Sequence, residues 1–241
     1  MTYISPRFLL FACASLLFLT ACDSSDGNDD PVPLNVLTAV DVEADPAVNV
    51  DPNSGRPVGN GLYTLFDLDT GSIVLSSSET NLAVREQDSV STAWDIGFQS
   101  TTIIFNGGTS GPGQGTAQLL TEPFSAVTEA PETGYVADGA NTSCPAVQTP
   151  GGTFPGAPFA ICTGSDNGWY NYNPQINLVS PLAGRTIVLT TGEGNFAKVR
   201  ILSYYQGNPN PPDASVPSRY YTFEYILQPD GTRSFESTTA D

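Results

Sequence analysis

The sequence offers few side chains that could perform catalysis or hold a metal. It contains 4 Cys, 1 Met and no His, and the single Met is residue 1. Without His, a Ser-His-Asp or Cys-His nucleophile system is excluded, and so is His-ligated zinc or haem. No nucleophile and base can be paired from the residues that remain, so we expect a binding protein rather than an enzyme.

Cys22 stands at the end of a pattern that is typical of exported proteins. A single cation, Arg7, precedes an apolar run over 8–19 that is too short to span a bilayer. Residues 19–22, Leu-Thr-Ala-Cys, resemble the lipobox of bacterial lipoproteins, in which the Cys becomes the acylated N-terminus. We therefore expect a cleaved signal peptide over 1–21, a lipid on Cys22, and anchoring at the outer membrane or cell surface. An ordinary signal peptide with an incidental Cys is the alternative.

The segment that follows Cys22 is small, polar and acidic. Residues 23–30 read Asp-Ser-Ser-Asp-Gly-Asn-Asp-Asp and cannot bury apolar surface. We predict a flexible tether over 22–33 and a single all-β domain over 34–241. The net charge of -17 and the pI near 4.1 argue against nucleic acid as a partner, because phosphate binding needs clustered Lys and Arg.

Cys144 and Cys162 remain as a pair, in a stretch rich in Pro, Gly, Thr and Ser. In an exported protein such a pair favours a disulfide. Closing a loop of about 18 residues contributes ~3 kcal/mol in the chain-entropy model. Two thiolates on a metal are the alternative, which is disfavoured because the spacing matches no zinc or redox motif.

Three other motifs favour structural interpretations. Asp67 and Asp69 could begin a calcium site, but Asp69 opens a turn and the EF-hand spacing is absent. The Gly-rich segment 106–115 lacks the Gly-Lys-Ser/Thr ending of a phosphate loop, so a tight loop with positive φ is favoured. Lys198 and Arg200 share one face of a predicted strand, where an exposed pair is favoured over a catalytic amine.

Apolar alternation predicts strands along most of the chain. Residues 92–99 alternate, with Trp94, Ile96 and Phe98 on one face, and 220–228 form another strand with an aromatic core face. Successive strands are joined by turns too short for helical crossovers, so we expect an all-β fold of mostly antiparallel sheets. Further strands are predicted near 34–40 and over 62–68, 72–75, 102–105, 185–191 and 196–205.

Six segments occur in an informative order along the chain. They are 62–67 (Leu-Tyr-Thr-Leu-Phe-Asp), 94–98 (Trp-Asp-Ile-Gly-Phe), the Gly-rich segment 106–115, 168–172 (Gly-Trp-Tyr-Asn-Tyr), 192–201 and 220–225. Together they resemble the HmuY family of haem-binding bacterial surface lipoproteins. The resemblance implies an all-β, HmuY-like sandwich, surface attachment by lipid, and capture of haem for delivery to an outer-membrane transporter.

The resemblance also implies where haem iron would be held, and this chain departs from it there. The family supplies two axial His or Met side chains, which correspond here to the regions 136–167 and 173–174. Neither region contains His or Met. Tyr135, Tyr170 and Tyr172 are the available substitutes, because a phenolate can ligate haem iron. Aromatic packing on strand faces is the alternative for all three.

The predicted haem pocket therefore consists of Tyr135, Trp169, Tyr170 and Tyr172, in a cleft between the Gly-rich side and the 136–175 loops. Haem held by stacking alone, or another apolar ligand, would also suit such a pocket. The alternative function is a non-catalytic structural or interaction lipoprotein of the same fold. In that case the disulfide loop fills the cleft and the protein binds another ligand or none.

Overall fold

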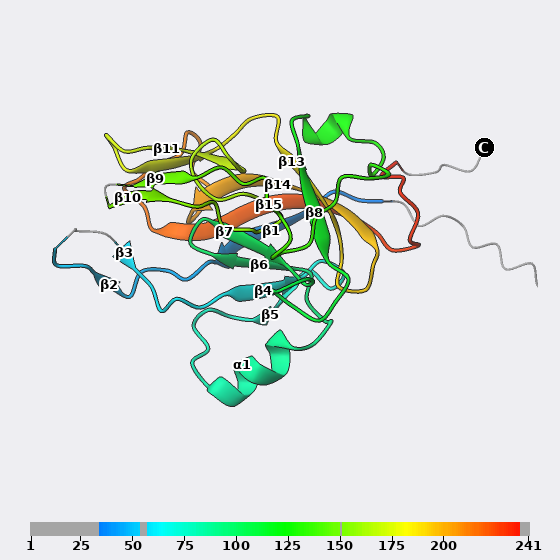
Figure 1. The fold of residues 1–241 in the computed structure, drawn as a ribbon, viewed down its shortest axis with the longest axis horizontal. Helices are drawn as coiled ribbons and strands as arrows, with labels where there is room; N and C mark the ends of the chain where they lie inside the picture. Colours follow the sequence, from blue (N-terminus) through cyan, green and yellow to red (C-terminus); the bar gives the residue numbers. More distant parts are fainter. Residues whose placement is uncertain (1–33, 54–56, 150, 237–241) are drawn as a thin grey trace, which may run out of the picture. The chain divides into compact units, whose positions relative to one another are not determined.

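The computed structural model describes residues 34–53, 57–149 and 151–236 of the chain. Antiparallel strands dominate these residues, which confirms the predicted all-β fold class (Figure 1). The elements in chain order are β1 (Leu37–Glu43), β2 (Asn49–Val50), β3 (Pro57–Val58), β4 (Thr64–Asp67), β5 (Ser72–Leu75), α1 (Leu82–Ser89), β6 (Ile96–Gln99), β7 (Thr102–Phe105), β8 (Thr116–Leu120), the 3-10 helix η1 (Phe124–Ala126), β9 (Val147–Thr149), β10 (Gly152–Phe154), β11 (Tyr170–Asn173), β12 (Leu178–Pro181), β13 (Thr186–Thr190), β14 (Phe196–Tyr205) and β15 (Ser218–Gln228).

Two antiparallel sheets share the main core of the protein. The larger sheet has the strand order β1-β15-β14-β13-β8, and the smaller sheet has the order β5-β4-β6-β7. Aromatic rings from both sheets meet between them: the Phe66 and Phe98 centroids each lie 5.3 Å from that of Phe223. Burying a large apolar side chain contributes about 1.5–3 kcal/mol, so this layer of rings holds the sheets together. The predicted core face of 220–228 is confirmed, because Tyr221, Phe223 and Tyr225 are all buried in the main core.

The prediction that Trp94 shares a face with Ile96 and Phe98 is wrong. Strand β6 begins only at Ile96, and Trp94 packs with Leu65 in a cluster on the other face of the smaller sheet. The intervening Asp95 is held by hydrogen bonds from two backbone N–H groups. Regular alternation therefore starts after Asp95, not before it.

Lys198 is buried, which corrects the prediction of an exposed pair with Arg200. Lys198 is 4% exposed, and its ammonium donates hydrogen bonds to the carbonyls of Phe124 and Val127 at 2.9 and 2.7 Å. Desolvation lowers the pKa of Lys198. The reason for the burial is that the outer face of the larger sheet is covered by distant segments of the chain. They form a second cluster, whose buried members are Phe124, Val127, Ala130, Val188, Ile226 and Phe235.

The Gly-rich segment 106–115 wraps around the fully buried side chain of Asn106. The amide group of Asn106 bonds two backbone carbonyls and one backbone N–H group. A Cβ atom at Gly113 or Gly115 would lie 2.6 Å from the Asn106 carbonyl oxygen, so close approach requires glycine at both positions. The predicted positive φ occurs in this segment at Gly108. The segment is a structural support.

The predicted signal peptide (1–21), the lipid-bearing Cys22 and the tether (22–33) lie outside the described residues, and they stay predictions together with the domain boundaries. Within the described part of the chain, no helix has the length and hydropathy that crossing a bilayer requires.

Candidate ligand-binding site

A disulfide closes the loop in the region that the sequence analysis assigned to the ligand. Cys144 and Cys162 are bonded, with their Cα atoms 5.2 Å apart, which confirms the predicted pair. The pair is therefore not available as two thiolate ligands for a metal. The hairpin β9–β10 lies inside the closed segment. The covalent closure removes freedom from the unfolded chain and stabilises the fold by ~3 kcal/mol for a loop of this length.

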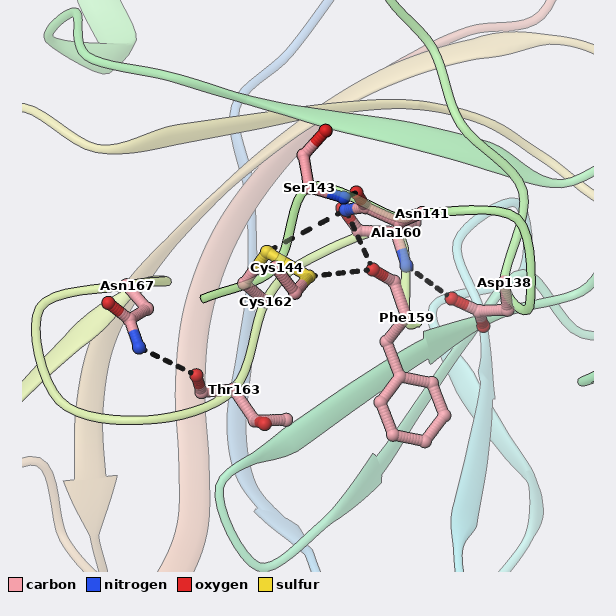
Figure 2. The surroundings of a disulfide bond; sticks show 9 residues. All are labelled: Asp138, Asn141, Ser143, Cys144, Phe159, Ala160, Cys162, Thr163 and Asn167. Atoms are coloured by element: carbon pink, nitrogen blue, oxygen red, sulfur yellow. Dashed lines mark hydrogen bonds between the residues drawn. A yellow bond between two sulfur atoms is a disulfide. The ribbon is translucent and has the colours of Figure 1, made fainter. Parts of the chain in front are cut away.

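Asp138 fastens this disulfide loop to the smaller sheet. Its buried carboxylate accepts hydrogen bonds from the backbone N–H groups of Phe105 on β7 and Ala160 in the loop, at 2.9 and 2.7 Å. Figure 2 shows Asp138 close to Ala160, with the disulfide beyond Asn141. The Asn141 amide donates to the carbonyls of Phe159 and Ala160. Burial raises the pKa of Asp138, against the two N–H bonds that lower it.

The end of the disulfide loop packs into the protein. Ala160 and Ile161 are buried in the main core, and Phe159 packs against the cluster that contains Trp94. The end of the disulfide loop is therefore part of the packed interior of the protein. Neither of the two cavities described below is lined by a residue between 136 and 182.

Trp169 and Tyr170, two of the predicted pocket residues, lie together in the main core. The indole N–H of Trp169 donates to the Thr101 carbonyl at 3.0 Å. The Trp169 ring centroid lies 4.9 Å from that of Tyr170 and 5.1 Å from that of Tyr221. Both side chains are buried, so stacking on a ligand would require displacing their core partners.

Tyr172 is the predicted pocket residue that faces solvent. It lies on the β11–β12 hairpin, is 39% exposed, and donates its hydroxyl proton to Asn177 Oδ1 at 2.8 Å. Two apolar side chains that the sequence analysis did not single out are also exposed on the hairpins, Phe154 at 53% and Ile176 at 57%. Figure 1 shows β9, β10 and β11 at one end of the sandwich. This hairpin end is defined by Phe154, Tyr172 and Ile176.

Tyr135 is separated from the other three predicted residues. It packs against the second cluster, with its ring centroid 6.0 Å from that of Phe196. Burial raises the pKa of Tyr135 to about 12, and the nearby Gln118 amide acts in the opposite direction. Gln118 does not reach hydrogen-bonding geometry, so the buried Tyr135 hydroxyl has no partner among the described residues. The four predicted residues therefore do not line one pocket.

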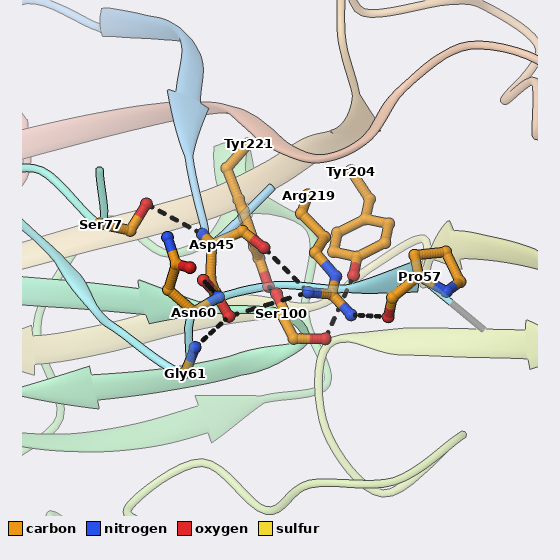
Figure 3. Close-up of polar contacts among 9 residues, drawn as sticks. All are labelled: Asp45, Pro57, Asn60, Gly61, Ser77, Ser100, Tyr204, Arg219 and Tyr221. Carbon is orange, nitrogen blue, oxygen red and sulfur yellow. Dashed lines mark hydrogen bonds and ion pairs between the residues drawn. The ribbon is translucent and has the colours of Figure 1, made fainter. Parts of the chain in front are cut away.

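Arg219, beside the β2–β3 hairpin, is engaged by the protein itself. Figure 3 shows its guanidinium between Asp45 and Pro57, whose carbonyls accept hydrogen bonds at 2.8 Å each. The Asp45 carboxylate lies 3.8 Å away and accepts hydrogen bonds from the backbone of Asn60 and Gly61. Asp45 and Arg219 both have positive φ, which costs energy in non-glycine residues and is maintained here by these contacts. The pair holds the hairpin to β15, a link that no local sequence pattern indicated.

A separate cavity of about 370 Å³ is acidic, with Asp67, Asp69, Asp95 and Glu193 in its lining. The Asp67 carboxylate is used in its own turn, where it accepts from the Asp69 N–H at 2.8 Å and the Thr70 hydroxyl at 2.7 Å. Burial raises the pKa of Asp95 to about 6. No group of three or more His, Cys, Asp or Glu among the described residues is placed to hold a metal ion.

These features suit binding through packing and hydrogen bonds. Two of the buried carboxylates, those of Asp95 and Asp138, each accept hydrogen bonds from two backbone N–H groups and are therefore directed at the protein. The exposed groups of the hairpin end are aromatic, aliphatic and amide side chains.

Comparison with known proteins gives one family. The family model described as HmuY protein matches residues 62–225, which is more than half of the chain. A search of curated proteins finds no match.

Solved structures resemble the chain at low sequence identity. An apo HmuY analogue from Tannerella forsythia is 17% identical with a TM-score of 0.42, over 83% of this chain and 100% of that chain. Apo PinO from Porphyromonas gingivitis is 15% identical with a TM-score of 0.40, over 82% and 98%. A Bacteroides vulgatus protein, described provisionally as an HmuY-like haem-binding protein, is 18% identical with a TM-score of 0.41, over 75% and 96%. At these values the likeness carries no argument about the site.

Proposed function

The chain belongs to the HmuY family, and on this premise we propose that it is a lipid-anchored, non-enzymatic binding protein that does not hold haem iron through axial ligands. The observation that carries the proposal is the packing of the disulfide loop. Ala160 and Ile161 from this loop are buried with Trp169 and Tyr170, in the region where the family resemblance would place an open haem pocket. Its binding surface is the exposed hairpin end.

Charge supports this proposal. The sequence has no Lys or Arg between residues 86 and 184, so the disulfide loop and the β11–β12 hairpin contain no cation for the propionates of haem. Arg219 is a cation beside the β2–β3 hairpin, but it is already engaged, because both of its terminal nitrogens donate to backbone carbonyls. The absence of His and of any Met beyond residue 1 leaves the phenols as the iron ligands that this region could offer.

Lipid anchoring rests on the Leu-Thr-Ala-Cys motif that ends at Cys22. Its test is metabolic labelling with a radioactive fatty acid in a bacterial host that processes lipoproteins. We expect label in the mature protein, loss of label and of membrane association in Cys22→Ser, and unchanged labelling in Cys13→Ser. Equal labelling of the Cys22→Ser variant would refute the anchor.

Hemin titration of the purified full chain tests the statement about haem. We expect no saturable shift of the Soret band and no saturable quenching of tryptophan emission. Both tryptophans, Trp94 and Trp169, are buried and packed against loop or core residues, so a ligand that opened the disulfide loop would change their emission. A stoichiometric Soret shift with the absorption spectrum of an axially ligated iron would overturn the proposal.

Haem capture, with delivery to an outer-membrane transporter, is the second candidate function, and the exposed phenol of Tyr172 favours it. Of the predicted pocket residues, Tyr172 is the one that could meet a ligand without disturbing the core. If haem is captured, we expect the Soret shift to be lost in Tyr172→Phe and retained in Tyr135→Phe, because Tyr135 packs on the opposite face of the larger sheet. Equal shifts in the two variants would exclude Tyr172 as the iron ligand.

A further inference from the structure

The helix α1 lies against β5 without burying a single residue. An isolated helix of eight residues is not stable in water, so contacts with the rest of the protein must hold it. Asn81 caps its first turn. Arg85 anchors it, because one terminal nitrogen donates to the carbonyls of Ser76 and Glu79 and the other donates to the carbonyl of Tyr63, at 2.9–3.0 Å. Polar contacts therefore fix the helix and leave its apolar side chains uncovered.

A groove of about 250 Å³ lies between β5 and α1. Among the described residues β5 pairs with β4 alone, so its outer edge has backbone groups without a strand partner. Ile73, Leu82 and Val90 extend the exposed apolar surface beside it, and Leu82 is 72% exposed. An unpaired edge next to an apolar lining suits an extended peptide segment. The lining consists of Val74, Leu75, Ser76, Ser78, Glu79, Val84 and Asp88.

The groove is negatively charged. Glu79 and Asp88 are both in its lining, and neither forms an ion pair with a described residue. The local cation, Arg85, is occupied by three backbone carbonyls. A segment that carries Lys or Arg is therefore attracted to the groove, and an acidic segment is repelled.

We propose that the β5–α1 groove binds an extended segment of a partner protein in which Lys or Arg side chains alternate with aliphatic ones. The segment pairs along the free edge of β5. Its aliphatic side chains pack on Val74 and Val84, and its longer Lys or Arg side chains extend to Glu79 and Asp88, the acidic residues of the same lining. This surface is separate from the hairpin end and does not depend on the ligand bound there.

The test uses a synthetic fluorescent peptide of alternating Lys and Val and the purified full chain, with binding followed by fluorescence anisotropy. Because the chain has a net charge of -17, any cationic peptide is attracted to it non-specifically. The critical variant is therefore Glu79→Gln/Asp88→Asn, and the matched control is Glu122→Gln/Glu193→Gln, which removes the same charge elsewhere. Gln at position 79 keeps the oxygen that accepts from the Asn81 N–H.

We expect the groove variant to raise the Kd roughly fivefold or more and the control to raise it by less than about twofold. A peptide with Glu in place of Lys should not bind, and N-methylation of alternate backbone nitrogens should abolish binding by removing the strand pairing. Equal weakening by the two double variants would overturn the proposal, as would binding of the Glu peptide. Failure of hemin to bind has no bearing on this result.

Discussion

The carboxylate of Asp95 accepts a hydrogen bond from the backbone N–H of Gly192 at 2.9 Å. Its other oxygen accepts from the backbone N–H of Leu68, also at 2.9 Å. Leu68 follows β4 of the smaller sheet and Gly192 follows β13 of the larger sheet, so one buried side chain joins the two sheets beside the acidic cavity. The Asp of the Trp-Asp motif, which carries part of the family resemblance, therefore has a structural role: it connects the two sheets.

The substitution Asp95→Asn tests this connection between the two sheets. The amide would present an NH₂ group to one of the two N–H donors, leaving that donor unsatisfied in a buried place. We expect the free energy of unfolding at about pH 4 to fall by about 1–3 kcal/mol, measured by urea denaturation. An unchanged unfolding midpoint would contradict the assigned role.

The pH dependence of Asp95→Asn provides a second readout. The folded-state pKa of Asp95 is raised from 3.8 to about 6, mainly by burial. A raised carboxyl pKa means that the stabilisation is full below about pH 4 and is lost as the pH rises through about 6. The wild type should therefore lose at most about 3 kcal/mol through this group, since each pKa unit corresponds to about 1.36 kcal/mol. The difference in the free energy of unfolding between wild type and variant should therefore become smaller between about pH 4 and pH 6. A difference that does not change with pH would refute the raised pKa of Asp95.

Removal of the disulfide should weaken the whole fold. In Cys144→Ser/Cys162→Ser, the closed loop becomes free in the unfolded state, and we expect stability to fall by about 3 kcal/mol. The measurement is urea unfolding with and without a reductant. The reductant should lower the midpoint of the wild type and leave that of the variant unchanged; a reductant effect on both would point to another cause.

Asp138→Asn should loosen the disulfide loop without breaking its covalent bond. One of the N–H groups of Phe105 and Ala160 would face an amide NH₂ group in place of a carboxylate oxygen. We expect faster hydrogen exchange at both amides, measured by NMR or mass spectrometry. The control is Asp166→Asn, because Asp166 is exposed, lies just beyond Cys162 outside the disulfide loop, and accepts from Asn171. Equal acceleration in the two variants would argue against a specific fastening by Asp138.

Lys198→Met should be more costly than the same change at Arg200. The first leaves the Phe124 and Val127 carbonyls without their donor, at a cost of about 1–3 kcal/mol. The second removes a partly exposed ion pair with Glu224, which contributes about 0–1 kcal/mol. Urea unfolding of both variants gives the comparison. A larger loss in Arg200→Met would show that the burial of Lys198 is not important for stability.

The single lysine also offers a chemical probe. An amine-acylating reagent should modify Lys198 slowly in the folded chain and rapidly in urea, because Lys198 is buried under the segment around η1. Rapid labelling in native buffer would contradict this packing.

Patterns along single strands were sufficient to predict much of the sandwich. The alternation of 220–228 places Tyr221, Phe223 and Tyr225 in the core because a strand exposes its two faces alternately, whatever lies elsewhere in the chain. The disulfide was predicted from composition and from the expectation of export, and the ordered motifs indicated the HmuY family that the family model matches. The short helix α1 was not predicted, because hydrogen bonds from Arg85 to three carbonyls outside the helix hold it in place, and it has no apolar stripe that the sequence would show.

The tertiary structure decided which aromatic residues could meet a ligand. By sequence alone, Tyr135, Trp169, Tyr170 and Tyr172 are equivalent as aromatic side chains near a variable loop. Burial sets them apart: two are locked into the main core, one lies against the second cluster, and Tyr172 faces solvent. The prediction that Lys198 is exposed was wrong for the same reason. Alternation determines which face of a strand a side chain occupies, but long-range packing determines what covers that face.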